Sequence, residues 1–74
     1  MSGVVEEGQL KGAFKGFKNR DTEFQFHGGK RWRQNEHKYL YHYAYMPRAK
    51  VVQDGGRHRL HVDGVDESVE VRRA

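Results

Sequence analysis

The sequence predicts an all-β fold in which five or six short antiparallel strands close into one small barrel. Three observations predict it. No window of the 74 residues keeps apolar residues at the i, i+3, i+4 and i+7 spacing of a helix. Glycines recur along the chain, and the runs between them are short and rich in residues that favour strands. A closed barrel also protects the strand edges that so short a chain cannot otherwise cover.

Length and composition bound the class of protein. Seventy-four residues form one domain. Residues 1–7 show no periodicity and are expected to be a disordered tail, which leaves residues 8–74 for the barrel. The chain has no cysteine, so disulfides, thiolate metal sites and a cysteine nucleophile are excluded. It shows neither a signal-peptide pattern nor an apolar run that could span a membrane, so we expect a cytoplasmic protein without a membrane partner.

The first strands are expected between residues 8 and 27. The run GQLKGAFKGF places Leu10 and Phe14 on one side of a strand, because side chains alternate between the two faces. KNRD then forms a polar turn. In the next run, TEFQFH, Phe24 and Phe26 point the same way.

The glycine turn that follows decides which residues of the next hairpin meet. If the loop is residues 28–30, Phe26 opposes Trp32. A two-residue Gly-Gly loop would instead oppose Phe26 to Arg31 and turn Trp32 to the other side. We expect the three-residue loop, because a glycine then occupies the position that needs a positive φ.

A tyrosine-rich strand is expected over residues 37–45, ending before Pro47. Tyrosine occupies every second position there, so four phenol rings share one side with His37. Burying four rings would remove on the order of 600–1,000 Å² from water and contribute about 15–25 kcal/mol of gross stabilisation. A small domain has only about 5–15 kcal/mol of net stability. We therefore expect most of these tyrosines to lie in the core or at the barrel rim. A stacking surface and a self-association surface are the alternatives.

The last strands surround a second glycine turn. RAKVVQ and RHRLHV flank Asp-Gly-Gly, a pattern typical of a hairpin. A loop over residues 54–57 would oppose Val51 to Leu60. DGVDES turns the chain once more, and VEVRR is expected to point its two valines inward.

No residue pattern indicates catalysis or metal binding. His58 and His61 are three residues apart and His37 and His42 are five apart, so each pair lies on opposite faces of a strand. The sequence contains no nucleophile elbow and no phosphate-binding glycine loop followed by a helix. We therefore expect no catalytic residue, no metal and no cofactor.

The charge distribution favours an anionic partner. The formal net charge is +4, and residues 30–59 hold eight basic residues against two acidic ones. Residues 61–70 hold four acidic residues and no Lys or Arg, which also allows internal pairing. Basic and aromatic residues interleave around both glycine turns, as in small nucleic-acid-binding barrels. The candidate partner-binding residues are Lys30, Arg31, Trp32, Arg33, His37, Tyr41, Tyr43, Arg57 and Arg59.

Three segments carry a resemblance to a known domain: FKGFKNRDTEFQFHGGKRWRQ, YHYAYMPRAKVV and GGRHRLHVDGVDESVEVRR. Over residues 12–73 they resemble a small bacterial domain of unknown function with the pattern Trp-x-Gln, Tyr-x-Tyr, Pro, Gly-Gly and Val-x-Val-Arg-Arg. This chain has Gly-Gly at the first turn where that pattern has Asn-Gly. The resemblance implies an SH3-like barrel and implies no activity, cofactor or catalytic residue.

These observations together predict a binding module that is not an enzyme. The first hypothesis is that a basic and aromatic surface binds an anionic partner such as nucleic acid. The alternative is a protein–protein interaction or self-assembling module that uses the tyrosine-rich strand, in which case the partner is another protein or a second copy of the chain.

Overall fold

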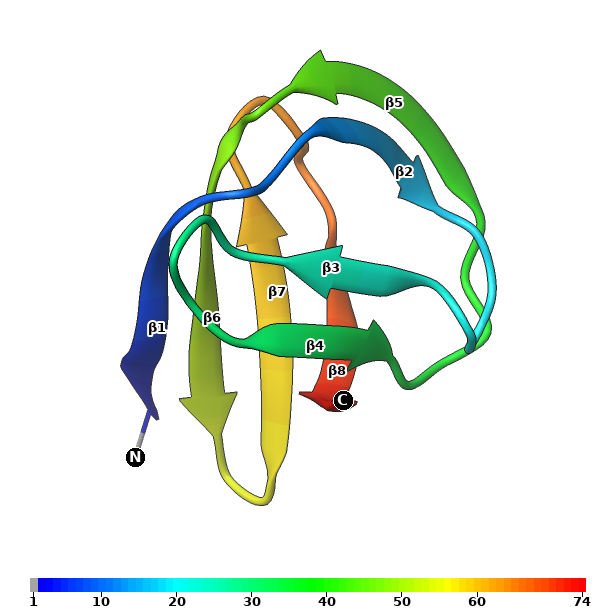
Figure 1. Cartoon of the computed structure of the whole chain (residues 1–74). Coiled ribbons are helices and arrows are strands. Elements are labelled where there is room, and N and C mark those ends of the chain that lie inside the picture. The colour runs from blue at the N-terminus through cyan, green and yellow to red at the C-terminus, as the bar shows by residue number, and fades with distance from the viewer. Residues whose placement is uncertain (1) are drawn as a thin grey trace.

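The computed structural model describes residues 2–74, and over these residues it contains strands and no helix (Figure 1). The all-β prediction is therefore confirmed, although the number of strands is larger than expected. All strand pairs are antiparallel. The strands are β1 (Ser2–Gln9), β2 (Ala13–Phe17), β3 (Glu23–Gln25), β4 (Arg31–Gln34), β5 (Leu40–Tyr45), β6 (Arg48–Asp54), β7 (Arg57–Val62) and β8 (Ser68–Arg73).

The strands form two sheets. The larger has six strands in the order β1-β6-β7-β8-β4-β3, and the smaller is the ribbon β2-β5. In Figure 1, β4 crosses in front of β7 and β8, the loop between β3 and β4 passes in front of β6, and the β2-β5 ribbon arches over one end. The two outer strands of the large sheet approach each other at one point, a bridge between Leu10 and Phe26. Beside this bridge the His27 N–H donates to the Gln9 carbonyl at 2.7 Å.

The core lies between these layers and is dominated by aromatic rings. Trp32 and Phe17 are fully buried, and the rings of Phe17 and Phe24 meet edge to face with their centroids 6.0 Å apart. Leu40 packs against this cluster from β5. Outside the tyrosine-rich strand, the residues expected to point inward are confirmed in the core, and Phe17, for which no side was predicted, joins them. The members are Leu10, Phe14, Phe17, Phe24, Phe26, Trp32, Ala49, Val51, Leu60, Val62, Val69 and Val71.

The two hairpin predictions had different outcomes. In β6-β7 the expected register is confirmed, with Val51 opposite Leu60, but the loop is shorter than expected: Asp54 pairs with Arg57, so only Gly55 and Gly56 form the turn. In β3-β4 the prediction is wrong by two residues: Phe24, rather than Phe26, opposes Trp32. The loop is residues 27–29 and is closed by the Phe26 N–H donating to the Lys30 carbonyl at 3.3 Å. Gly28 adopts a φ of 74° in this loop, so the three-residue length was right and only its position differed. A shift of two residues keeps each side chain on its expected face.

A disordered tail was expected over residues 1–7, but residues 2–7 belong to strand β1, and Met1 lies outside the described residues. This segment is held by backbone pairing with β6 and by one carboxylate, neither of which requires apolar periodicity. The Glu6 carboxylate accepts hydrogen bonds from the Lys30 backbone N–H at 2.9 Å and from the Trp32 indole N–H at 2.5 Å. Glu6 therefore attaches β1 to the β3-β4 hairpin.

We expect Glu6→Ala to lower the free energy of unfolding by about 2 kcal/mol, because it leaves the buried indole N–H of Trp32 without an acceptor. Urea denaturation followed by tryptophan fluorescence measures this loss. Glu7→Ala is the matched control: its side chain is exposed on the same strand, and we expect a change within about 0.5 kcal/mol. Equal effects of the two substitutions would show that the carboxylate contacts of Glu6 do not stabilise the fold.

Candidate functional site

The tyrosine side of β5 faces water. The strand is extended as expected, but it covers residues 40–45 rather than 37–45, so Tyr39 lies just before it. The prediction that most of its rings are core or rim residues is wrong. The exposed fractions are 75% for Tyr39, 67% for Tyr41, 57% for Tyr43 and 71% for Tyr45. The opposite side of the strand is half-buried, and it carries Leu40, His42, Ala44 and Met46.

The reason for this orientation lies in the core. Four phenylalanines, two of them from β2, and Trp32 already fill the interior, so β5 covers that interior with its smaller and mixed side. We call the four exposed rings (Tyr39, Tyr41, Tyr43 and Tyr45) the tyrosine face. Contiguous exposed apolar patches above about 300–600 Å² are uncommon on monomeric proteins and mark interaction sites. The tyrosine face is therefore the first candidate for a functional surface.

Strand β2 places positive charge beside the tyrosine face. Ala13 lies opposite Tyr45, and Phe14 lies opposite Ala44 with its ring in the core. Lys15 lies at a register shift between Phe14 and Gly16, where alternation does not fix the direction of a side chain, but it is exposed and belongs to the strand that pairs with β5. Lys11, Lys15 and Lys18 are all exposed, and among residues 2–74 no carboxylate pairs with their ammonium groups. We call these three residues the lysine edge.

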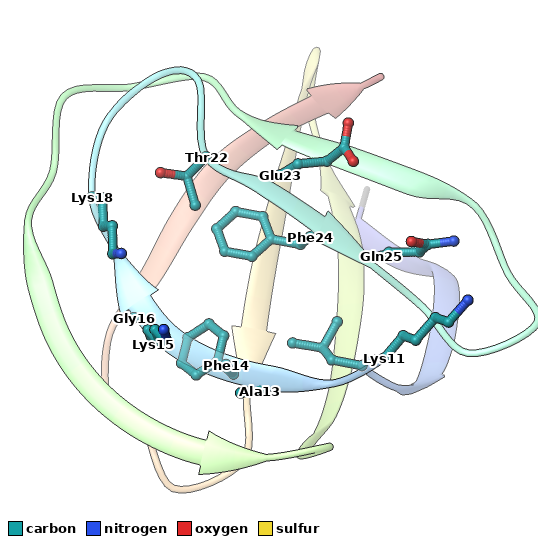
Figure 2. A pocket seen from close by; sticks show the side chains of 11 residues that line it. Lys11, Ala13, Phe14, Lys15, Gly16, Lys18, Thr22, Glu23, Phe24 and Gln25 are labelled. Atoms are coloured by element: carbon teal, nitrogen blue, oxygen red, sulfur yellow. The ribbon is translucent and has the colours of Figure 1, made fainter.

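The lysine edge borders a hollow of about 190 Å³ between β2 and β3 (Figure 2). Its ends are closed by the turn after β2 and by the Lys11 N–H, which donates to the Gln25 carbonyl at 2.7 Å. Phe14 and Phe24 line its floor, but each is only 4% exposed. The apolar floor of the hollow is therefore barely accessible, and the exposed side chains around it are the three lysines together with Ala13, Glu23 and Gln25.

Trp32 cannot serve as the stacking residue that the sequence suggested. It is 0% exposed. Its indole N–H is bound by Glu6, the His58 ring lies 5.3 Å from its ring, and the Arg73 guanidinium lies 5.3 Å from its centroid. Trp32 belongs to the core and is removed from the set of candidate partner-binding residues.

The predicted arginines are largely engaged within the protein. Arg31 and Arg33 flank the Glu23 carboxylate at 4.0 and 3.5 Å. Arg57 lies 3.9 Å from Glu70. These three arginines, together with Arg59, therefore do not form the free basic cluster around Trp32 that we expected.

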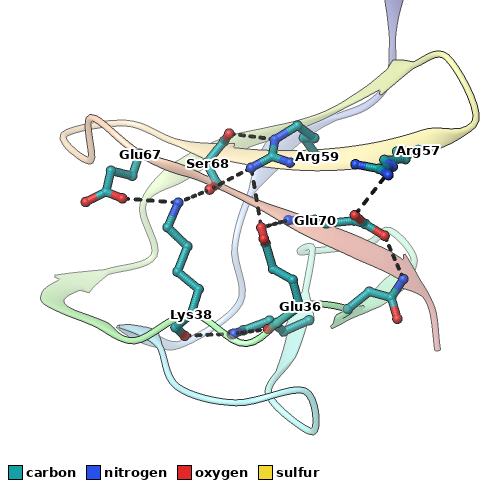
Figure 3. A network of polar contacts seen from close by, with 9 residues as sticks. Glu36, Lys38, Arg57, Arg59, Glu67, Ser68 and Glu70 are labelled. Atoms are coloured by element: carbon teal, nitrogen blue, oxygen red, sulfur yellow. Dashed lines mark hydrogen bonds and ion pairs between the residues drawn. The ribbon is translucent and has the colours of Figure 1, made fainter.

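Arg59 has the most internal partners of the predicted arginines (Figure 3). Its guanidinium donates to the Ser68 hydroxyl at 2.9 Å, to the Ser68 carbonyl at 3.2 Å and to the Glu36 carboxylate at 3.3 Å. The acidic partner of Arg59 is thus Glu36, whereas the acidic run after residue 60 pairs with the basic middle of the chain through Glu70 with Arg57 and Glu67 with Lys38. Lys30 and His37 are exposed, and His37 lies in the loop that leads into β5.

The loop that leads into β5 is held by hydrogen bonds and an ion pair with Gln34 and with residues around the start of β8. The Gln34 side chain is 0% exposed, and its amide N–H groups donate to the carbonyls of Glu36 and Lys38 at 2.9 Å each. Lys38 in turn donates to the Ser68 carbonyl at 2.7 Å and lies 3.1 Å from Glu67. The start of the tyrosine face is therefore held in place by buried and half-buried hydrogen bonds.

The histidines do not gather into a metal site. Among residues 2–74, no three His, Asp or Glu side chains lie where they could hold one ion. His42 packs near Phe14, with ring centroids 6.4 Å apart. Partial burial, with the positive charges of Lys50 and Arg59, lowers the pKa of His61.

The structure thus changes the candidate site. Tyr41 and Tyr43 remain candidate binding residues, and the neighbouring tyrosines Tyr39 and Tyr45 are added to them. The lysine edge was missed, although its signal is in the sequence: Lys11, Lys15 and Lys18 fall within ten residues that contain no acidic residue.

Fold and site together define a small all-β domain whose exposed aromatic ribbon is bordered by lysines. Comparisons with models of protein families, with curated proteins and with solved structures find no significant match to this chain. Among residues 2–74 there is no helix long and apolar enough to cross a membrane.

Proposed function

We propose that the protein is a binding module, not an enzyme, and that nucleic acid binds to the tyrosine face and the lysine edge. The observation that carries the proposal is the exposure of four neighbouring rings, from 57% to 75%, beside lysines that have no carboxylate partner within residues 2–74. Every base has an aromatic face, and each base stacked on a protein ring contributes about 1–3 kcal/mol. Lysine ammonium groups supply the attraction to phosphate.

For the architecture, we propose an SH3-like barrel. The bridge between Leu10 and Phe26 supports this, because it links β1 and β3, the outer strands of the six-stranded sheet. The β2-β5 ribbon would then be the part of the barrel wall that carries the ligand.

Nucleic-acid binding is tested by the fluorescence anisotropy of labelled oligonucleotides at 50 and 200 mM salt. If three phosphates are neutralised, we expect the affinity to fall about 20-fold over this range for a single strand and about 40-fold for a duplex. Tyr41→Ser and Tyr43→Ser are expected to weaken binding, whereas Val4→Ser, which removes an exposed apolar side chain from β1, is the control. The fluorescence of Trp32 is not a suitable reporter because the ring is buried. Absence of binding at 50 mM salt to any oligonucleotide, single- or double-stranded, would reject the proposal.

Self-association through β5 is the second candidate. It is favoured by one observation: among the described strands, β5 pairs only with β2, and Leu40–Tyr45 carries no Asp, Glu, Lys or Arg. This candidate predicts a sedimentation coefficient that rises with protein concentration and returns to the monomer value in Tyr43→Ser. A monomer at every concentration would exclude it.

A further inference from the structure

We infer that the ligand is a single strand of nucleic acid, held extended with one base on each ring of the tyrosine face and its phosphates along the lysine edge. This inference rests on the proposed function and specifies the class of nucleic acid. It also assigns separate tasks to the two parts of the site: the rings contact bases, and the lysines contact phosphates.

The spacing of the rings requires an unstacked strand. Side chains on one face of an antiparallel strand repeat about every 6.8 Å. In one strand of a duplex, successive nucleotides advance only about 3.4 Å. Bases on successive tyrosines are therefore about twice as far apart as stacked bases, so the strand must be extended. A duplex cannot bind in this way, because the faces of its bases are covered by their neighbours.

Electrostatics decide on which side of the rings the phosphates lie. The lysine edge follows β2, on one side of β5. The turn between β7 and β8 approaches β5 at two other places. Gly64 lies beside the ring of His42 in the strand, and Glu67 pairs with Lys38 just before the strand begins. That turn carries the exposed carboxylates Asp63, Asp66 and Glu67. Phosphates are repelled there, so they lie over β2.

Four rings imply a footprint of about four nucleotides on each domain. Binding must break the stacking between neighbouring bases, and this costs the least free energy in pyrimidine runs because their bases stack most weakly. We therefore expect oligo-dT and oligo-U to bind more tightly than oligo-dA of equal length. Comparing dT with U also separates DNA from RNA as the ligand.

The test uses the full chain and a series of labelled dT oligonucleotides of two, four, six and eight nucleotides, with a DNA duplex of eight base pairs as the comparison. We expect the affinity to rise steeply up to about four nucleotides and then only slowly, and the duplex to bind at least tenfold more weakly than dT8. Equal affinity for the duplex and dT8 would overturn the inference but leave nucleic-acid binding in place. A failure of every oligonucleotide to bind would reject the proposed function itself.

Two substitutions separate the tasks of rings and lysines. Tyr43→Ser is expected to weaken dT8 binding about 5- to 150-fold without changing the salt dependence. Lys15→Ala is expected to reduce the slope of log affinity against log salt by about 0.7. Lys50→Ala, an exposed lysine on β6, is the matched control. If Lys15→Ala and Lys50→Ala change the slope equally, the phosphates do not lie along the lysine edge. All three residues are exposed, and circular dichroism checks that each variant is folded.

Discussion

Gly16→Ala is expected to lower the free energy of unfolding by about 3 kcal/mol or more. Gly16 has a φ of 98°, which L side chains rarely adopt. An added Cβ would also overlap the carbonyl oxygen of Leu40 and lie only 2.9 Å from the His42 nitrogen. Both atoms belong to the backbone of β5 and cannot move without separating β5 from β2. The variant should therefore lose the ribbon that carries the tyrosine face, as measured by chemical denaturation and by amide exchange at residues 40–45.

Two other glycines separate the causes of this effect. Gly12 also has a positive φ, 76°, but an added Cβ would meet no atom within 4 Å. We expect Gly12→Ala to cost about 1–2 kcal/mol from backbone strain alone. Gly56→Ala meets no atom either and needs no positive φ, so a change within about 0.5 kcal/mol is expected. Should Gly12→Ala and Gly16→Ala prove equally destabilising, the close approach of β2 to β5 would contribute nothing.

Gln34→Leu is expected to cost about 3 kcal/mol. The side-chain oxygen of Gln34 accepts a hydrogen bond from the Lys18 backbone N–H at 3.1 Å, and its amide nitrogen serves the carbonyls of Glu36 and Lys38. Leucine would fill the site but leave three half-buried backbone groups without a partner, each worth about 1 kcal/mol or more. Denaturant titration measures the loss, and faster amide exchange at residues 36–40 would show that the approach to the tyrosine face has loosened.

Gln53→Leu is the control for this substitution, because Gln53 is exposed on β6. We expect it to change the free energy of unfolding by no more than about 0.5 kcal/mol. If Gln34→Leu were as well tolerated as Gln53→Leu, apolar packing would compensate for the lost hydrogen bonds. The binding surface would then not depend on this buried amide.

Turn residues and side-chain alternation were sufficient to predict the structure where a short turn directly joins two paired strands. The Asp-Gly-Gly turn and the alternation on either side correctly predicted that Val51 opposes Leu60. The alternation in the last strand likewise placed Val69 and Val71 in the core. The β3-β4 register was harder, because two adjacent glycines permit more than one loop position with the same side-chain faces.

Two features had no local signal. Strand β1 has no apolar periodicity by which it could be predicted. It is held by pairing with β6 and by the contacts of Glu6 with Lys30 and Trp32, which are far away in the sequence. The ion pairs that the arginines make within the protein also could not be predicted from the sequence. Arg59 meets Glu36 only because the loop before β5 lies over β7 and β8 in the folded chain.

The sequence by itself determined that the tyrosines of residues 39–45 share one side of an extended strand, because alternation is a property of the backbone. Only the tertiary structure decided that this side faces water. Each side of β5 carries both apolar and polar groups, so the sequence of the strand alone does not determine which side is buried. The choice depends on the volume left in the core, and the rings of β2, β3 and β4 have already filled it, with Phe17 and Trp32 at 0% exposure.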